Sequence, residues 1–286
     1  FLYRKELPDS GGAGKYRGGL SAESCFIPHN TANIVQDTLS SGNATPTSTG
    51  MMGGYPSTTN AYMFFRNTDI LERNGESHMI EDISEVIGTE EVLQLRQENF
   101  VQYKSDVYAV RWTGGGGFGD PLDRAPEDIE ADLEAYAITP AAAQDLYGAV
   151  LDAKGRVDLA ATDKRRAGIR ASMVARHGHK GRVREGTLLC EASVNLHVKR
   201  DEVGAYWACA KCSTDLGPTT GNYKDACFRE DLPVSASNPL IGDPARFIDD
   251  AVAFRRFHCP GCGAQLDNEI AVSRDPVLVD ISVVTG

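Results

Sequence analysis

The sequence predicts an α+β fold, in which a β-rich first half is followed by helices and then by a second, smaller β-rich domain. Three observations support this prediction. Before the glycine-rich stretch at 112–124, strand-like segments alternate with polar turns. Directly after it, apolar residues recur at helical spacing. Five of the seven cysteines then fall between Cys209 and Cys262, which sets the last third of the chain apart.

The bulk properties limit the functions open to the chain. Its 286 residues suffice for one large or two medium domains. A formal net charge of -11 argues against nucleic acid or an anionic membrane as the main partner. Because there is neither an apolar run of membrane-spanning length nor a signal-peptide pattern, we expect a cytoplasmic protein. The chain enters strand-like sequence at Phe1 without an initiator methionine, so we expect a partner chain with the preceding part to cover that edge.

The first half is predicted to be mostly strands and turns. The stretch 30–60, rich in Ser, Thr, Gly and Asn, is predicted as one long polar loop, either an ordinary surface crossing or an interface segment. A short helical turn is expected at 69–73, and 90–95 is ambiguous between helix and strand. The predicted strands share apolar, aromatic or β-branched character and lie at 1–9, 20–27, 60–66 and 107–112, and 83–87 is predicted as a further strand or a short amphipathic piece.

The stretch 112–124 contains four consecutive glycines followed by Gly119. Gly114, Gly116 and Gly119 fit the G-x-G-x-x-G pattern of dinucleotide-binding loops. That pattern also requires a helix directly after the glycines, because the amides of its first turn hold the pyrophosphate. Asp120 and a proline intervene here, so we interpret the stretch as a structural turn and predict no cofactor-binding residue in it.

A second glycine-rich loop at 9–19 invites comparison with the phosphate-binding P-loop. The comparison fails because Asp9 occupies the first glycine position and Tyr16 stands where a magnesium-binding hydroxyl is required. Lys15 and Arg17 could still meet an anion, but two cations beside glycines are more often a solvated turn. We therefore interpret this loop as structural as well.

Beyond the glycines the period changes to that of helices. The stretch 126–137 places Ile129, Leu133 and Tyr136 on one face, which we expect to be buried. Thr139, followed by a proline, is typical of a helix N-cap and predicts a second helix.

A short strand at 147–152 and a turn at Lys154 are predicted to follow. The stretch 158–173 then predicts a long helix with a strongly basic face. We interpret that face as a solvated surface, with docking of another subunit as the alternative.

Three runs in the first part share their order with a known family, namely 9–19, 114–124 and 139–151. Together they resemble the C-terminal portion of the hydantoinase B/oxoprolinase family, over about residues 1–176. The resemblance implies a subunit of an ATP-dependent amidohydrolase or carboxylase. It also implies a hydantoinase A-like partner that binds ATP, with Mg or Mn, and phosphorylates the substrate. No catalytic residue is assigned, because the metal ligands known in some relatives lie in an N-terminal part that this sequence lacks.

Cysteine spacing gives the strongest chemical signal. Cys209 and Cys212 form one C-x-x-C pair, and Cys259 and Cys262 form another. Two such turns present four thiolates, which complete a tetrahedral zinc site without an open coordination position. We therefore predict these four cysteines as ligands of a structural zinc. A redox dithiol and a disulfide are the alternatives.

The remaining cysteines and histidines carry weaker signals. Cys227 or His258 could replace a ligand, although each also has a simple core or surface role. Cys25 and Cys190 are isolated in the sequence. We interpret the other candidate histidines as ordinary surface, core or linker residues, namely His29, His78, His177 and His179.

Residues 188–284 resemble the small zinc-containing gamma subunit of acetone carboxylases. The resemblance is carried by the runs 206–209, 222–225 and 259–266. A gamma-like domain beside a hydantoinase B-like half implies a ketone carboxylase of the acetone and acetophenone type. In that family, ATP activates the enol of the ketone and bicarbonate by phosphorylation, and carbon-carbon bond formation follows.

The sequence thus favours a subunit, or a fragment, of a hetero-oligomeric ATP-dependent ketone carboxylase that uses bicarbonate and an aromatic ketone such as acetophenone. We expect the first domain at 1–176, a linker at 177–187 and a zinc-binding domain at 188–286. The chain would help to enclose the carboxylation chamber and dock the ATP-binding subunit, since activated phosphates are lost to water in an open site. Two alternatives stay open: a hydantoinase/oxoprolinase-type lactam hydrolase subunit, and a non-catalytic zinc assembly module.

Overall fold

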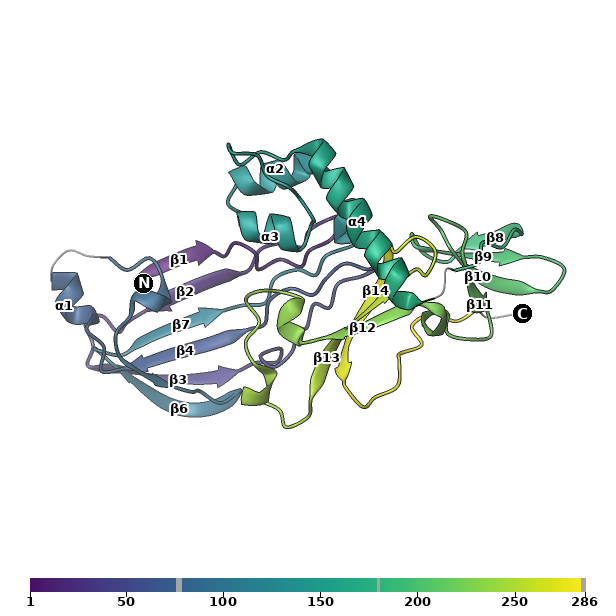
Figure 1. Ribbon diagram of the computed structural model, residues 1–286. Coiled ribbons are helices and arrows are strands. Elements are labelled where there is room, and N and C mark those ends of the chain that lie inside the picture. The colour runs from purple at the N-terminus through teal and green to yellow at the C-terminus, as the bar shows by residue number, and fades with distance from the viewer. Residues whose placement is uncertain (76–78, 179–180, 284–286) are drawn as a thin grey trace.

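The computed structural model describes residues 1–75, 79–178 and 181–283. Within these ranges the strands form four sheets. The molecule is elongated, with the N-terminus towards the end that carries the first sheet and the strands within residues 187–218 at the opposite end (Figure 1). The helices within residues 126–177 lie together over the middle. The predicted α+β class is confirmed.

The first sheet is five-stranded and antiparallel. Cys25, Val107 and Ala109 are fully buried on one face, and Phe64 and Tyr108 belong to an aromatic cluster on the other. In spatial order its strands are β1 (Tyr3–Glu6), β2 (Ala22–Phe26), β7 (Val107–Arg111), β4 (Ala61–Arg66) and β5 (Thr89–Glu91). The strand predictions at 1–9, 20–27, 60–66 and 107–112 are confirmed.

A two-stranded ribbon beside this sheet corrects the prediction of one long polar loop at 30–60. Strand β3 (Asn33–Leu39) pairs with β6 (Arg96–Tyr103). The ribbon has few buried side chains and uses polar pairs, such as the Gln36 amide that donates to Gln102 at 2.6 Å. Its strands are stabilised by pairing over a long sequence distance, which polar composition does not reveal. The stretch 83–87 is also no strand, because a 3-10 turn occupies Ile83–Glu85.

The helices begin and end where their caps place them. Thr139 accepts a hydrogen bond from the Ala142 amide at 3.2 Å, which confirms it as an N-cap. Asp158 caps the longest helix in the same way, through the Ala161 amide at 3.0 Å. Gly178 ends that helix at φ +78. In the part of the chain that the structure describes, the α-helices are α1 (Ile70–Gly75), α2 (Pro126–Glu134), α3 (Pro140–Asp145) and α4 (Leu159–His177).

Two expectations for the helical region were wrong. Ile129 is fully buried as predicted, but Tyr136 is 81% exposed. The reason is that α2 ends at Glu134 and Tyr136 lies beyond it with φ +55. The expected strand at 147–152 is reduced to a single bridge between Leu151 and Val157.

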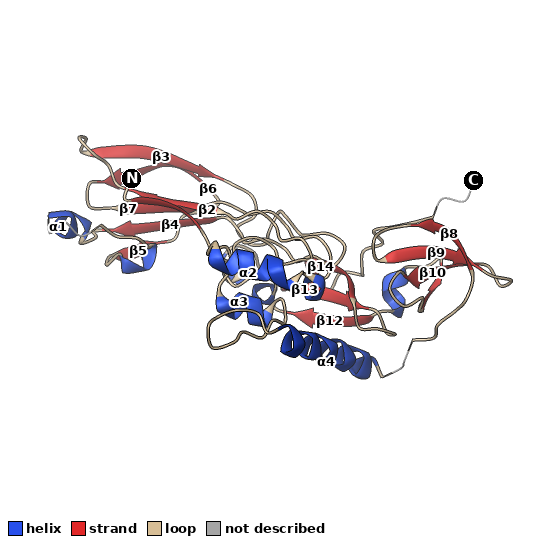
Figure 2. Ribbon diagram, turned by 90° about the horizontal axis from the view of Figure 1, so that it is seen from above, coloured by secondary structure: helices blue, strands red, loops and turns tan. Residues whose placement is uncertain are grey.

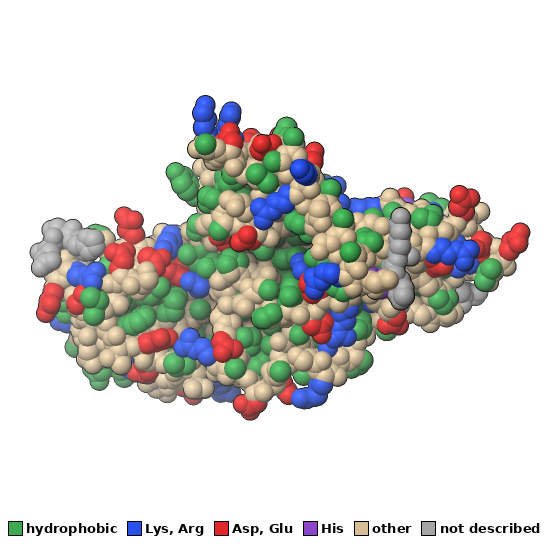
Figure 3. Space-filling model, in the orientation of Figure 1, with side chains coloured by type: hydrophobic (Ala, Val, Ile, Leu, Met, Phe, Trp, Pro, Cys, Tyr) green, Lys and Arg blue, Asp and Glu red, His purple; other side chains and the backbone are tan. Residues whose placement is uncertain are grey.

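The basic face of α4 is also different from the expected solvated surface. Lys and Arg side chains follow this helix in Figure 3, but several of them make contacts within the chain. The Arg166 guanidinium donates to the Tyr147 carbonyl at 2.9 Å, and Arg170 contacts Asp120 at 2.7 Å and Asp123 at 2.8 Å. Helix α4 is therefore anchored to the end of the glycine-rich stretch.

The last third of the chain contains two sheets. Strands β8 (Thr187–Glu191), β9 (Leu196–Arg200), β10 (Ala205–Cys209) and β11 (Asp215–Pro218) form a four-stranded sheet around the buried Trp207. Strands β12 (Phe228–Leu232), β13 (Val252–His258) and β14 (Gln265–Val272) form the other. Figure 2 shows β8–β10 at one end of the molecule, with β12–β14 between them and the first half.

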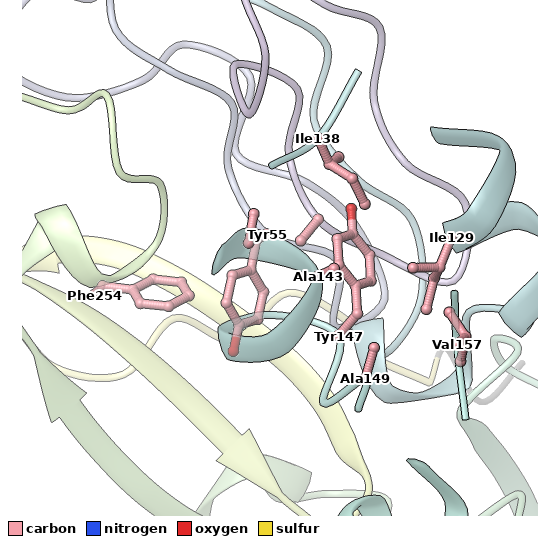
Figure 4. Close-up of a cluster of buried hydrophobic side chains, with 10 residues drawn as sticks. Tyr55, Ile129, Ile138, Ala143, Tyr147, Ala149, Val157 and Phe254 are labelled. Carbon is pink, nitrogen blue, oxygen red and sulfur yellow. The ribbon is translucent and has the colours of Figure 1, made fainter. Parts of the chain in front are cut away.

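The three-stranded sheet shares a core with the first half of the chain. Phe254 of β13 packs edge-to-face on Tyr55, with 5.1 Å between the ring centres (Figure 4). Ile129, Ala143 and Tyr147, from the helical region, belong to the same cluster. Of the helices in the described ranges, none has the length and apolar character that crossing a membrane requires.

Candidate metal centre and the glycine platform

Two turns of the same construction carry the paired cysteines. In the first, the Cys209 amide donates to the Thr214 carbonyl at 3.0 Å, and the Ser213 amide donates to the Cys209 carbonyl at 2.9 Å. In the second, the Cys259 amide donates to the Ala264 carbonyl at 2.9 Å, and the Gly263 amide donates to the Cys259 carbonyl at 2.8 Å. We call these turns, residues 209–214 and 259–264, the cysteine turns.

The cysteine turns face each other and bring four sulfurs together. All four ligand atoms of Cys209, Cys212, Cys259 and Cys262 lie within 4.8 Å of one another. The Sγ atoms of Cys209 and Cys262 are 3.9 Å apart, and those of Cys212 and Cys259 are 3.6 Å apart. Sulfurs placed at the usual zinc–sulfur distance around a tetrahedral centre would be about 3.8 Å apart. The donor set therefore fits a metal ion, and the spacing is too long for a disulfide.

The thiols perturb one another strongly. Hydrogen bonding with Cys209 lowers the pKa of Cys212, and it lowers the pKa of Cys262 to about 7. The pKa of Cys209 and that of Cys259 are raised by their hydrogen bonds within the same cluster. The four thiols thus differ in how readily they ionise when no cation is bound. A divalent metal would be bound by their thiolate forms.

The other candidate ligands lie outside the cluster. The buried Cys227 thiol faces the Tyr223 carbonyl at 3.5 Å. His258 is buried next to Cys259, where burial lowers its pKa to about 4 and keeps the ring neutral. Cys25 lies in the core of the first sheet, and Cys190 is exposed on β8. His29 is exposed and His177 ends α4, whereas His78 and His179 fall outside the described residues.

Three glycine-rich segments, residues 10–19, 48–57 and 112–120, interleave to form what we call the glycine platform. The Gly12 amide donates to Gly115 at 2.9 Å, and the Gly115 amide donates to Gly19 at 2.9 Å. The Gly117 amide donates to the Tyr55 carbonyl, also at 2.9 Å. Several of the amides that a phosphate-binding loop would offer to its ligand are therefore used within the protein.

The glycines of the platform are required by close approach of the backbone. A Cβ atom built on Gly18 would lie 1.9 Å from the Gly115 carbonyl oxygen. On Gly54 and on Gly117 it would meet other backbone oxygens at 2.1 Å. No helix opens directly from the glycines, since Asp120 caps a short 3-10 turn at Pro121–Asp123. The interpretation of both glycine-rich loops as structural agrees with this geometry.

Ion pairs connect the platform, α4 and the first cysteine turn. Asp123 contacts Arg170 of α4 and is also ion-paired with Lys211. Lys211 lies between Cys209 and Cys212 in the first cysteine turn. The Asp120 carboxylate accepts a hydrogen bond from the backbone amide of Gln265 at 3.2 Å. A Cβ on Gly263 would lie 2.2 Å from the Arg170 carbonyl oxygen, so the second cysteine turn also touches α4 directly. Sequence reasoning missed Lys211 and Asp123, and the only local signal was a lysine inside a C-x-x-C turn.

Two separate segments of the chain match two different protein families. Residues 3–121 match the hydantoinase B/oxoprolinase family, and residues 185–284 match the acetone carboxylase gamma subunit family. The chain is 32% identical over 169 residues to the acetophenone carboxylase delta subunit of Aromatoleum aromaticum, covering 56% of this chain and 25% of that protein. It is 29% identical over 197 residues to the acetone carboxylase alpha subunit of Xanthobacter autotrophicus, covering 62% and 25%.

A further subunit and a solved structure are also similar. The chain is 35% identical over 81 residues to the acetophenone carboxylase beta subunit of Aromatoleum aromaticum, covering 27% of this chain and 63% of that one. The nucleotide-free structure of acetone carboxylase, from work on ATP-dependent acetone carboxylation, matches with a TM-score of 0.52 at 28% identity, over 61% of this chain and 25% of that chain. The chain thus spans a quarter of the length of its alpha- and delta-subunit relatives. One part of the chain is similar to the hydantoinase B/oxoprolinase family and another to the acetone carboxylase gamma subunit family, and its homologues are subunits of acetone and acetophenone carboxylases.

Proposed function

We propose that this chain is part of a hetero-oligomeric ATP-dependent ketone carboxylase. The observation that carries the proposal is the presence of both family segments in one polypeptide, since the gamma family takes its name from acetone carboxylase. We further propose bicarbonate and an aromatic ketone such as acetophenone as substrates, because two different acetophenone carboxylase subunits are similar to this chain.

Within such a complex the chain would act as scaffold and enclosure. Several platform amides are used internally, and the glycine-rich stretch leads into a short 3-10 turn, so we assign ATP, with Mg or Mn, to a hydantoinase A-like partner. Other carboxylase subunits are proposed as further partners, because the relatives of this chain are named as subunits of such enzymes. We keep 1–176, 177–187 and 188–286 as the proposed first domain, linker and second domain, and the cytoplasm as the proposed location.

We propose that Cys209, Cys212, Cys259 and Cys262 hold a structural zinc. The matched cysteine turns and the sulfur spacings support this assignment. Zinc would neutralise the thiolates and hold the two turns together. Because four protein ligands fill a tetrahedral site, the metal would have no position for substrate.

The decisive experiment is reconstitution with the other subunits from the source organism. We expect ATP hydrolysis that depends on both acetophenone and bicarbonate, with label from 13C-bicarbonate recovered in a β-keto acid product. Acetone, a lactam and a hydantoin serve as parallel substrates.

The same assay separates the alternatives. ATP turnover stimulated by the lactam or hydantoin without bicarbonate would indicate a hydrolase subunit. An assembled, metal-loaded complex that turns over ATP with none of these substrates would indicate a non-catalytic assembly module.

A further inference from the structure

Three carboxamide side chains of the last third of the chain bind three consecutive carbonyls of the glycine platform. Asn195 donates to the Met52 carbonyl at 2.7 Å, Gln265 donates to Gly53 at 2.7 Å, and Asn268 donates to Gly54 at 2.5 Å. Asn195 and Gln265 are buried. These donors bind backbone carbonyls, which every residue has. The contact therefore depends on the backbone conformation of the platform and not on its side chains.

Further contacts surround this row. The Arg256 guanidinium donates to the Tyr55 hydroxyl at 2.5 Å, next to the ring contact between Tyr55 and Phe254. The buried Asn238 donates to the Asp9 carbonyl at 2.9 Å. We call this surface between the platform and the residues after 185 the seam. It combines an apolar core with side-chain hydrogen bonds to backbone carbonyls, and protein–protein interfaces likewise combine apolar contact with direct hydrogen bonds.

The platform is shaped for this contact. Gly53 has φ +88, and a Cβ on it would lie 2.7 Å from the Gln265 carbonyl oxygen. The carbonyls of residues 52–54 would need other partners if the second segment were absent, because buried backbone acceptors are almost always paired. The glycines therefore permit backbone contact across the seam as well as within the platform.

We infer that the glycine platform is the docking face for the gamma-like segment, and that the seam is a subunit interface that became intramolecular when the two segments were joined in one chain. In Aromatoleum aromaticum the similar proteins are separately named delta and beta subunits. Here residues 3–121 and 185–284 belong to one polypeptide, yet they contact each other through non-covalent groups of the kind that hold subunits together. The inference is independent of the proposed catalytic activity.

The test uses the full chain with a site-specific protease sequence inserted after Gly178, at the end of α4. The folded protein is cleaved, diluted and examined by size-exclusion chromatography and native mass spectrometry. We expect both pieces to migrate as one complex at sub-micromolar concentration. Separation of the pieces at micromolar concentration would overturn the inference.

Matched variants locate the affinity at the seam. Combining Asn195→Ala, Gln265→Ala and Asn268→Ala should raise the dissociation constant of the cleaved pieces about a hundredfold, since each lost hydrogen bond weakens binding by roughly fivefold. The control is Asn222→Ala, which removes an amide that donates to the Leu278 carbonyl at 3.2 Å within the second segment. This variant should bind as tightly as the unchanged protein.

The single variants Gln265→Ala and Asn268→Ala are cleaved in parallel, so that the result does not depend on folding of the triple variant. Each protein is first shown by circular dichroism to be folded before cleavage. An unchanged dissociation constant in both single variants, or equal weakening by Asn222→Ala, would contradict the assignment of the interface to the seam.

Discussion

The glycine platform and the cysteine turns solve the same problem by opposite means. Both must hold tight chain reversals that lack regular secondary structure. The platform does so with backbone hydrogen bonds between segments that approach too closely for any side chain. The cysteine turns instead bring four ionisable sulfurs together. The order of the platform therefore comes from backbone contacts alone, whereas the cysteine turns add to their own backbone hydrogen bonds a cluster of sulfurs that could hold a metal.

The largest effect is expected from a substitution within the glycine platform. Gly18→Ala should prevent folding or lower the free energy of unfolding by at least about 4 kcal/mol, because its Cβ would lie 1.9 Å from the Gly115 oxygen. Gly19→Ala is the matched control, since nothing lies within 4 Å of the added Cβ. It should change stability by less than about 1 kcal/mol. Urea denaturation of both variants measures the difference, and equal stabilities would show that close packing does not maintain the platform.

The next effect concerns the metal. Cys259→Ser should abolish stoichiometric zinc binding and lower the free energy of unfolding by at least about 3 kcal/mol, because one ligand is lost. Cys190→Ser, at an exposed cysteine on β8, should change neither quantity by a measurable amount. Elemental analysis and thermal denaturation provide the readouts. Full zinc occupancy in the Cys259→Ser protein would contradict the proposed ligand set.

A smaller effect compares the two cysteine turns with each other. Gly263 has φ +71 and Ser213 has φ +58 at equivalent positions. Gly263→Ala should lower the free energy of unfolding by about 2–4 kcal/mol, because its Cβ would lie 2.2 Å from the Arg170 carbonyl oxygen. Ser213→Gly should change stability by less than about 1 kcal/mol, because relief of the left-handed backbone is offset by loss of the Lys199–Ser213 hydrogen bond at 2.8 Å. Thermal denaturation with zinc in excess would rank the variants, and a reversed order would contradict this account.

The smallest effect tests the ion pairs by which Asp123, just after the platform, contacts α4 and the first cysteine turn. Burial opposes ionisation of Asp123, but Lys211 and Arg170 outweigh it and lower the pKa of the carboxyl group. The pKa of a free aspartate is about 4, so this stabilisation is present above about pH 4 and is lost as the pH falls towards the lower folded pKa.

Asp123→Asn should therefore lower the free energy of unfolding by about 0.5–1 kcal/mol at pH 7, and by progressively less in acid. Urea denaturation of both proteins at pH 7 and at about pH 3 measures the change. Zinc release in acid is controlled by making the same comparison with the metal removed. A cost that is as large at the lower pH would show that the variant acts through packing and not through charge.

Local pattern was sufficient to predict a large part of the molecule. The C-x-x-C spacing predicted that Cys209, Cys212, Cys259 and Cys262 would act together, and the structure brings their sulfurs into one cluster. Thr139 followed by proline predicted a capped helix, and apolar strand patterns predicted four strands of the first sheet. These features could be predicted because the residues that determine each of them are close in sequence or have a fixed spacing.

Other features depended on contacts between distant segments. The β3–β6 ribbon, the anchoring of Arg170 on Asp120 and the three carboxamides that bind residues 52–54 have no local signature. Sequence predicted that α4 would present a solvated basic face, whereas tertiary structure supplied the acidic and carbonyl partners.

By itself the sequence determined which turns must be free of side chains, which thiols must meet and where helices begin, because these requirements arise from backbone sterics and ligand chemistry. Only the tertiary structure decided that the glycine turns form a face for the cysteine-bearing segment. That face is created by backbone carbonyls, which every residue possesses and no sequence pattern distinguishes.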